Sequence, residues 1–237
     1  MQDHNTTAAP GAAAAAQAEA FGYLLEPEVR FLDAAVARLI PADDLGPGAR
    51  EAGVTYYIDR QLVSVWGSHG RNYRGGPWPA GTPQQGFQSR LTPREIYRAA
   101  IRDTNAYCRR QFGKMFEFLT TTQQEEVLHG LEDGKIELES VSAKLFFDLL
   151  MRNTEEGYFA DPMYGGNRDK IGWKLIGFPG VAASVYSERV ADQNAPYRAE
   201  PVSILDVVQQ RVKVDAQGYP KHVMQAQPAK KGSDGSR

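Results

Sequence analysis

The amino-acid sequence predicts a mainly α-helical protein. We expect an irregular multi-helix domain with long loops rich in glycine and proline, followed by an extended C-terminal tail. Apolar residues recur at helical spacing in five segments, helix-start signals precede several of them, and strand signals are few. The chain has 237 residues, of which 42% are apolar and 24% are charged, the usual balance of a globular protein. A chain of this length can bury a sizeable core.

The chain divides into a flexible leader (1–20), a helical domain (21–190) and an extended tail (191–237) that is disordered at its end. The first helix is expected over about 27–40, between two prolines that suit its start and its stop. The second is expected over about 49–65, with Val65 on its apolar face.

Three further helices have clear start signals. Thr92–Pro93 combines a cap with a first-turn proline. Thr122–Glu125 reads as a capping box for the fourth helix. Ser140 or Ser142 opens the fifth helix, on which Lys144, Asp148 and Arg152 are spaced for exposed charge pairs. A short helix near 179–190 is also expected.

Several classes of protein are excluded by what the sequence lacks. It has no apolar run long enough to span a membrane and no C-x-x-C-H motif for covalent haem. A single cysteine allows no internal disulfide, iron–sulfur cluster or cysteine-based zinc site. The net charge of -2 argues against a nucleic-acid partner. No signal peptide is visible in the first 20 residues, which form either a flexible leader or the start of a mature exported chain.

Four residues at three places in the sequence are candidates for chemistry. His69, in a Gly-rich loop, is a candidate general base, but no nucleophile motif accompanies it, which favours a solvated or interface histidine. Glu126 and His129 form one copy of the E-x-x-H pair that di-iron proteins use twice, so a favourable interaction of His129 with the helix dipole is the better interpretation. Cys108 lies on the apolar stripe of the third helix, where a buried inert thiol is favoured over a disulfide to a partner chain.

The segment 67–91 contains six glycines and three prolines and shows neither helical nor strand periodicity. A loop of this length inside a compact domain is commonly functional or disordered. Two interpretations are equally favoured, a surface loop whose aromatic residues pack on their own domain and a partner interface. The candidate interface residues here are Arg71, Tyr73, Arg74, Trp78 and Phe87.

The segment 156–180, EGYFADPMYGGNRDKIGWKLIGFPG, contains six glycines and five aromatic residues. It matches no phosphate-binding fingerprint, and a helix rather than a strand is expected before it. Asp161–Pro162 reads as a helix stop, and 165–167 as a tight turn with positive φ. A segment packing back onto a core, or an interface, is therefore expected. The residues concerned are Trp173, Leu175, Ile176 and Phe178 for packing, and Tyr164, Trp173 and Phe178 for the interface.

Four stretches carry a resemblance to a known family: LIPADDLGPGAREAGVTYYIDRQL (39–62), LTPREIYRAAI (91–101), QQEEVLHGLEDGKI (123–136) and AKLFFDLLMRNTEEGYFADPMYGGNRDKIGWKLIGFPG (143–180). They resemble the gluconate 2-dehydrogenase subunit 3 family, the small or gamma subunit of membrane-bound gluconate dehydrogenases. The resemblance covers about 21–185 and implies no catalytic, cofactor-binding or metal-binding residue in this chain.

The resemblance implies partners and a location. A large subunit would carry FAD and oxidise the sugar acid, and a multihaem cytochrome c subunit would pass electrons to quinone. The small subunit would support folding of the flavin subunit, its periplasmic export by the twin-arginine route and its stability, and would be membrane-associated only through its partners. The twin-arginine signal usual in the family is not present in this sequence.

Two other hypotheses remain open: an export chaperone that does not stay bound, and an independent enzyme that uses the loops of His69 and Asp161. If the chain is a bound subunit, Trp78→Ala or Trp173→Ala is expected to weaken assembly more than it weakens the chain's own fold.

Overall fold

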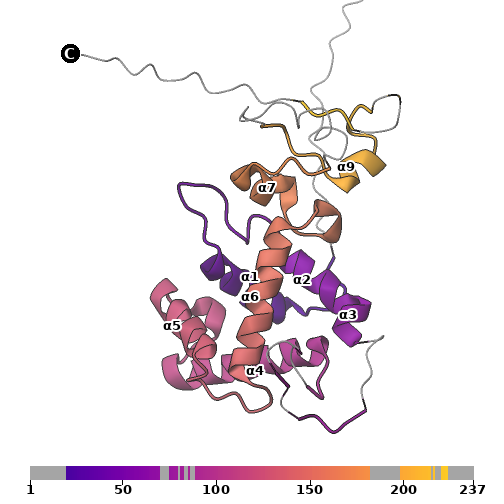
Figure 1. The fold of residues 1–237 in the computed structure, drawn as a ribbon. Coiled ribbons are helices and arrows are strands. Elements are labelled where there is room, and N and C mark those ends of the chain that lie inside the picture. The colour runs from indigo at the N-terminus through magenta and orange to yellow at the C-terminus, as the bar shows by residue number, and fades with distance from the viewer. Residues whose placement is uncertain are drawn as a thin grey trace, which may run out of the picture.

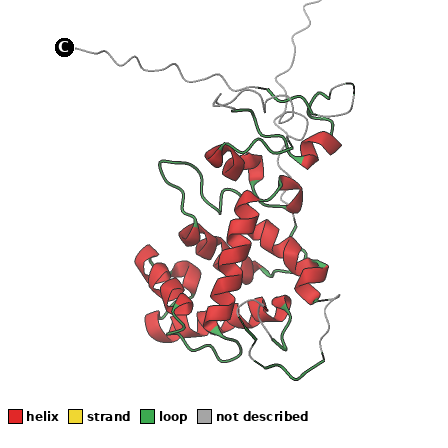
Figure 2. Cartoon of the chain, viewed as in Figure 1, coloured by secondary structure: helices red, strands yellow, loops and turns green. Residues whose placement is uncertain are grey.

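The computed structural model describes residues 20–69, 75–79, 81–82, 85, 89–181, 198–214, 216 and 220–223. Within these residues the protein consists of helices and connecting loops, with isolated β-bridges in place of a sheet (Figures 1 and 2). The predicted mainly α class is therefore confirmed. The leader, most of the expected short helix near 179–190 and the C-terminal end of the tail lie outside the described residues.

The helix α6 (Ala143–Phe159) runs through the middle of the molecule, and α2 (Val54–Val63) and α5 (Thr121–Glu132) pack against it (Figure 1). The core around it is aromatic. Tyr97 of α4 (Pro93–Phe112) meets the ring of Phe146 edge-on at 5.5 Å, and Phe31 of α1 (Glu26–Leu39) packs on Phe116 at 4.7 Å. The Tyr97 hydroxyl donates to Asn153 Oδ1 at 2.7 Å, so this buried polar group is satisfied.

The capped helix start at Thr92 is confirmed, and of the two serines predicted to open the fifth helix, Ser142 is the cap. The predicted start of α5 is two residues too late. Its capping box is Thr120 with Gln123, because in this run of three threonines Thr120 has the extended backbone that a cap requires. The Lys144–Asp148 pair forms at 3.8 Å, and because both side chains are exposed it contributes little to stability.

The second helix is shorter than predicted. Gly53 adopts a left-handed conformation with φ of 72°, so the helix begins after it, at Val54. The chain breaks again at Ser64, and Val65 starts a separate short helix, α3 (Val65–Ser68). Val65, which its spacing placed on the apolar face of the second helix, is half exposed.

The N-terminal segment is attached to α2 by one buried carboxylate. Asp59 accepts hydrogen bonds from the backbone N–H groups of Gly22, Tyr23 and Leu24 at 2.7, 2.9 and 2.8 Å. Three charge-assisted bonds fix the path of the chain into α1. None of the helices in the described part of the chain is long and apolar enough to cross a membrane.

Candidate partner-binding surface

Residues 161–181 fold around the C-terminal end of α6 as two short 3₁₀ turns, η3 (Pro162–Tyr164) and η4 (Arg168–Lys170), followed by α7 (Ile171–Ile176) (Figure 1). Two glycines allow this close approach. A Cβ on Gly166 would lie 2.1 Å from the carbonyl oxygen of Gly157, and one on Gly172 would lie 2.1 Å from that of Tyr158. Because no side-chain carbon fits at that distance, these glycines are required where the segment crosses the helix.

Asn167 joins this segment to the end of α6. Its side chain is buried, its Nδ2 donates to the carbonyl of Ala160, and its Oδ1 accepts from the N–H of Gly172, both at 2.8 Å. Gly165 and Asn167 have φ of 104° and 45°, which confirms the predicted turn with positive φ. The Gly-Gly-Asn sequence is thus a structural turn whose polar groups are used internally.

The indole of Trp173 fills the space between this segment and α6. Trp173 is 5% exposed, its Nε1 donates to the carbonyl of Phe159 at 2.7 Å, and its ring meets Phe178 edge-on at 5.1 Å. A partner could therefore touch the Trp173 ring only after a rearrangement. Leu175, Ile176 and Phe178 were also expected to pack inward, but they are exposed; the first two lie in the last turn of α7 and Phe178 follows its end.

The C-terminal segment is attached to the same end, and the predicted extended tail contains a short helix there, α9 (Ile204–Val208). Asp161 joins the two segments, because its Oδ1 accepts from the N–H of Met163 at 2.9 Å and its Oδ2 accepts from that of Ile204 at 2.7 Å. The backbones also pair, with the N–H of Val202 bound to the carbonyl of Pro179 at 3.0 Å.

An ion pair adds to this attachment. Lys170 Nζ donates to Asp206 Oδ2 at 2.7 Å, and both side chains are largely buried. Burial alone would raise the pKa of Asp206, but hydrogen bonds from Lys170 and Ser203 outweigh it and hold the pKa below the usual value. The carboxylate is therefore charged in the folded protein and ties α9 to η4.

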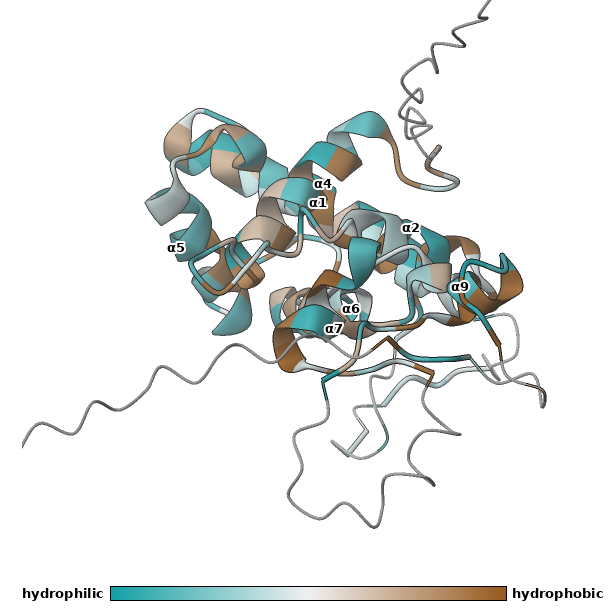
Figure 3. Cartoon of the chain, turned by 90° about the horizontal axis from the view of Figure 1, so that it is seen from above, coloured by the Kyte–Doolittle hydropathy of each residue, from teal (hydrophilic) through white to brown (hydrophobic). Residues whose placement is uncertain are grey.

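Exposed apolar side chains gather at this end. Eight of the fifteen large apolar side chains that are exposed in the described residues come from 159–178 and 204–208. Figure 3 looks onto this end and shows apolar positions of α7 in brown. We call these eight residues the end surface: Phe159, Met163, Tyr164, Leu175, Ile176, Phe178, Ile204 and Val208.

The sequence identified only part of this surface. Tyr164 and Phe178 were predicted as interface residues and are about half exposed. Ile204 and Val208 were missed, although Ser203 and Asp206 form an S-x-x-D capping box that could have revealed the helix to which they belong.

The other candidate interface residues lie elsewhere. Arg71, Tyr73, Arg74 and Phe87 fall outside the described residues, and Trp78 is half-buried. That these residues form an interface therefore stays a prediction from the sequence.

The candidate residues for chemistry, His69, His129 and Cys108, lie at two helix ends and in the core. His69 caps the end of α3 with φ of 52° and is half-buried, and His129 lies in the last turn of α5, 3.2 Å from Glu132. Cys108 is 0% exposed, and burial raises the pKa of its thiol to about 12. A disulfide from Cys108 to another chain would require the core to open. No group of three metal-ligating side chains comes together in the part of the chain that the structure describes.

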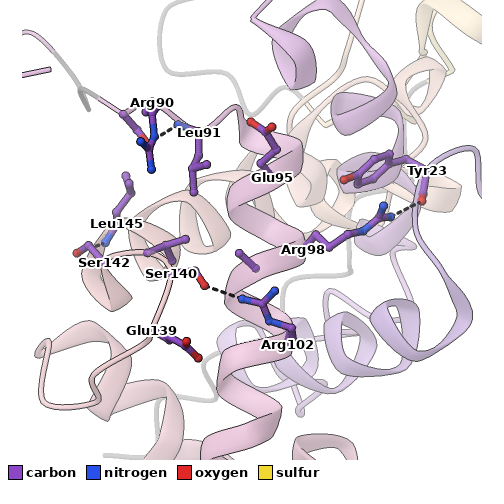
Figure 4. Close-up of a pocket in the computed structure, with 13 residues that line it drawn as sticks. Tyr23, Arg90, Leu91, Glu95, Arg98, Arg102, Glu139, Ser140, Ser142 and Leu145 are labelled. Carbon is purple, nitrogen blue, oxygen red and sulfur yellow. Dashed lines mark hydrogen bonds between the residues drawn. The ribbon is translucent and has the colours of Figure 1, made fainter. Parts of the chain in front are cut away.

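A groove of about 880 Å³ runs along α4, opposite the loop before α6 (Figure 4). The guanidinium of Arg98 binds Glu28 at 2.9 Å and the carbonyl of Tyr23 at 3.2 Å. Arg102 binds the neighbouring Asp103 at 2.8 Å and also reaches Ser140. These arginines connect α4 to two loops, and their charges are balanced by internal carboxylates, so the groove offers no concentrated charge to a ligand.

The chain was also compared with known proteins and protein families. No curated protein and no solved structure matches the chain. The sequence profile of gluconate 2-dehydrogenase subunit 3 matches residues 26–180, from the start of α1 to the end of the segment that folds around α6. The match covers more than half of the chain, and the chain therefore belongs to the gluconate 2-dehydrogenase subunit 3 family.

Proposed function

We propose that this protein is a non-catalytic small subunit of a membrane-associated, FAD-dependent sugar-acid dehydrogenase complex resembling gluconate 2-dehydrogenase. Its role is to support the folding, export and stability of the flavin subunit. The family match over residues 26–180 carries this proposal, because the family is defined as one subunit of a dehydrogenase.

The geometry of the segment around α6 supports a structural role. The polar groups that could have served chemistry there are engaged by the backbone. Both oxygens of Asp161 accept backbone N–H groups, and both ends of the Asn167 amide are bonded. This end exposes eight large apolar side chains, and exposed apolar patches mark sites of association.

The proposal places the cofactors in other chains. FAD would be carried by the large dehydrogenase subunit and c-type haem by a multihaem cytochrome subunit, and the complex would lie at the periplasmic side of the membrane. Substrate specificity would then be a property of the flavin subunit.

The test is to produce the flavin subunit with and without this chain and to measure its yield, its flavin content and its dehydrogenase activity. Loss of all three without this chain is expected. A flavin subunit that is abundant, flavin-loaded and fully active on its own would contradict the proposal. Mature complex that lacks this chain would favour an export chaperone, and turnover by the isolated chain would favour an independent enzyme.

A further inference from the structure

We infer that the end surface is the face that docks the flavin subunit, and that the matching face of the partner is apolar at its centre and carries carboxylates at its rim. This inference rests on the proposed function, and it adds which part of the chain makes the contact and what chemistry the partner must present.

The exposed area is sufficient for a stable contact. From their exposed fractions, which run from 39% for Met163 to 71% for Val208, the eight side chains expose roughly 700 Å², close to the ~800 Å² per partner of a standard interface. A monomeric protein seldom leaves that much apolar surface exposed at one end. Tyr164 and Phe178 supply aromatic side chains, which often dominate binding energy.

The charge around the end surface selects the partner. The described residues of 161–181 and 198–223 contain seven lysines and arginines against four acidic residues, whereas the whole chain has a net charge of -2. The Lys170–Asp206 ion pair removes one charge of each sign, which leaves six basic residues against three acidic ones, and Asp161 accepts backbone N–H groups. Lys174, Arg211 and Lys213 are exposed. The described residues of this end therefore carry a net positive charge, whereas the net charge of the whole chain is negative.

A positively charged rim disfavours a second copy of this chain as the occupant. A symmetric dimer through the end surface would bring the same excess of cations together, and like charges across an interface oppose association. A partner with acidic side chains around an apolar centre gains both the burial and the attraction. The contact should therefore weaken as salt concentration rises.

The surface is composite, because α7 belongs to the family domain and α9 follows the residues that the family profile matches. The Asp161 and Lys170–Asp206 contacts fix α9 beside η3. Residues from both parts should therefore matter to binding.

The experiment measures binding of the purified full-length chain to the large FAD-containing subunit of the same host, together with the melting temperature of each variant. Ile176→Asp and Val208→Asp each place a charge on the end surface. Phe118→Asp is the matched control, because Phe118 is as exposed as Ile176, at 60%, but lies in η2 (Phe116–Phe118), which packs on α1 and α4. The double variant Lys174→Glu, Lys213→Glu reverses the rim charge without touching the core.

We expect Ile176→Asp and Val208→Asp each to weaken binding about tenfold or more, with the melting temperature and the Phe118→Asp control close to wild type. The rim variant should weaken binding mainly at low salt. Wild-type affinity in both apolar variants and in the rim variant would overturn the inference while leaving the proposed function intact. A wild-type chain that fails to bind the flavin subunit would overturn the proposed function itself. A self-dimer that Ile176→Asp dissociates, with flavin-subunit binding unchanged, would assign the surface to a second copy and overturn the inference.

Discussion

Replacing Trp173 by alanine tests whether the 161–181 segment is held by its own core. The indole is 5% exposed, is hydrogen-bonded to the carbonyl of Phe159 and contacts the ring of Phe178. The substitution removes most of the apolar side chain from the space between α7 and the end of α6. The sequence alone predicts that this variant weakens assembly more than folding, whereas the structure predicts that folding of this end is affected first.

The expected magnitude follows from two contributions. Truncating a buried tryptophan to alanine costs about 3–5 kcal/mol, which combines the lost burial with the cavity that remains. Within that figure, the lost Nε1 hydrogen bond accounts for about 1 kcal/mol. Phe178 is exposed on one side and can move into the space, so we expect a value near the lower limit, about 3 kcal/mol. Trp173→Phe keeps a ring and loses the donor, and should cost about 1–2 kcal/mol.

Urea unfolding followed by circular dichroism measures the free energy of unfolding of the isolated chain, and hydrogen exchange locates the loss. Protection should fall in 161–181 and 198–214 before it falls in α4 or α6. If Trp173→Ala leaves the free energy of unfolding unchanged and abolishes only binding to the flavin subunit, the burial argument is refuted and the indole is a partner anchor.

Three other predictions concern Gly166, Cys108 and Asp206. Gly166→Ala should destabilise the chain by about 3 kcal/mol or more, because its Cβ would meet the Gly157 carbonyl. Gly134→Ala is the control and should cost only about 1 kcal/mol, because Gly134 has φ of 68° and open space around it. Melting curves of both variants measure the difference. Cys108 has a thiol pKa raised to about 12, so alkylation at pH 8 should be negligible in the folded chain and complete after unfolding, and a non-reducing gel of the complex should show no crosslinked band. The pKa of Asp206 is lowered in the folded protein, so its contribution to stability is present above its unfolded pKa of about 3.9 and is lost as pH falls through the folded pKa. The rate of proteolysis after residue 198 should therefore stay constant from pH 7 to pH 5 and rise below about pH 4. Asp206→Asn should remove that rise.

The sequence predicted the helices where the start signal was unambiguous. Thr92 with Pro93 predicted the start of α4 without an alternative, whereas the start of α6 was left between Ser140 and Ser142, of which Ser142 is the cap. It failed where local chemistry allowed more than one register, as at Thr120 and Thr122. The break at Gly53 was missed as well, because a glycine is tolerated inside a helix and only the fold shows that this backbone is left-handed.

For the end surface, the sequence could not predict which residues of 171–178 face solvent. Apolar residues at 173, 175, 176 and 178 are consistent with both packing and exposure, and a six-residue helix has too little periodicity to separate them. The structure separates them: Trp173 is buried and bonded to the carbonyl of Phe159 at the end of α6, whereas Leu175, Ile176 and Phe178 are exposed. The requirement for glycine at position 166 could not be predicted either, because it depends on how closely the loop approaches the carbonyl of Gly157 in the fold.

The most direct measurement of the central claim is purification of this chain, tagged, from its native host, with an absorbance spectrum of the eluted complex. The account predicts that flavin and haem absorbance elute together with the chain and that dehydrogenase activity towards a sugar acid is found in the same fractions. A chain that elutes alone, without colour and without activity, would contradict it.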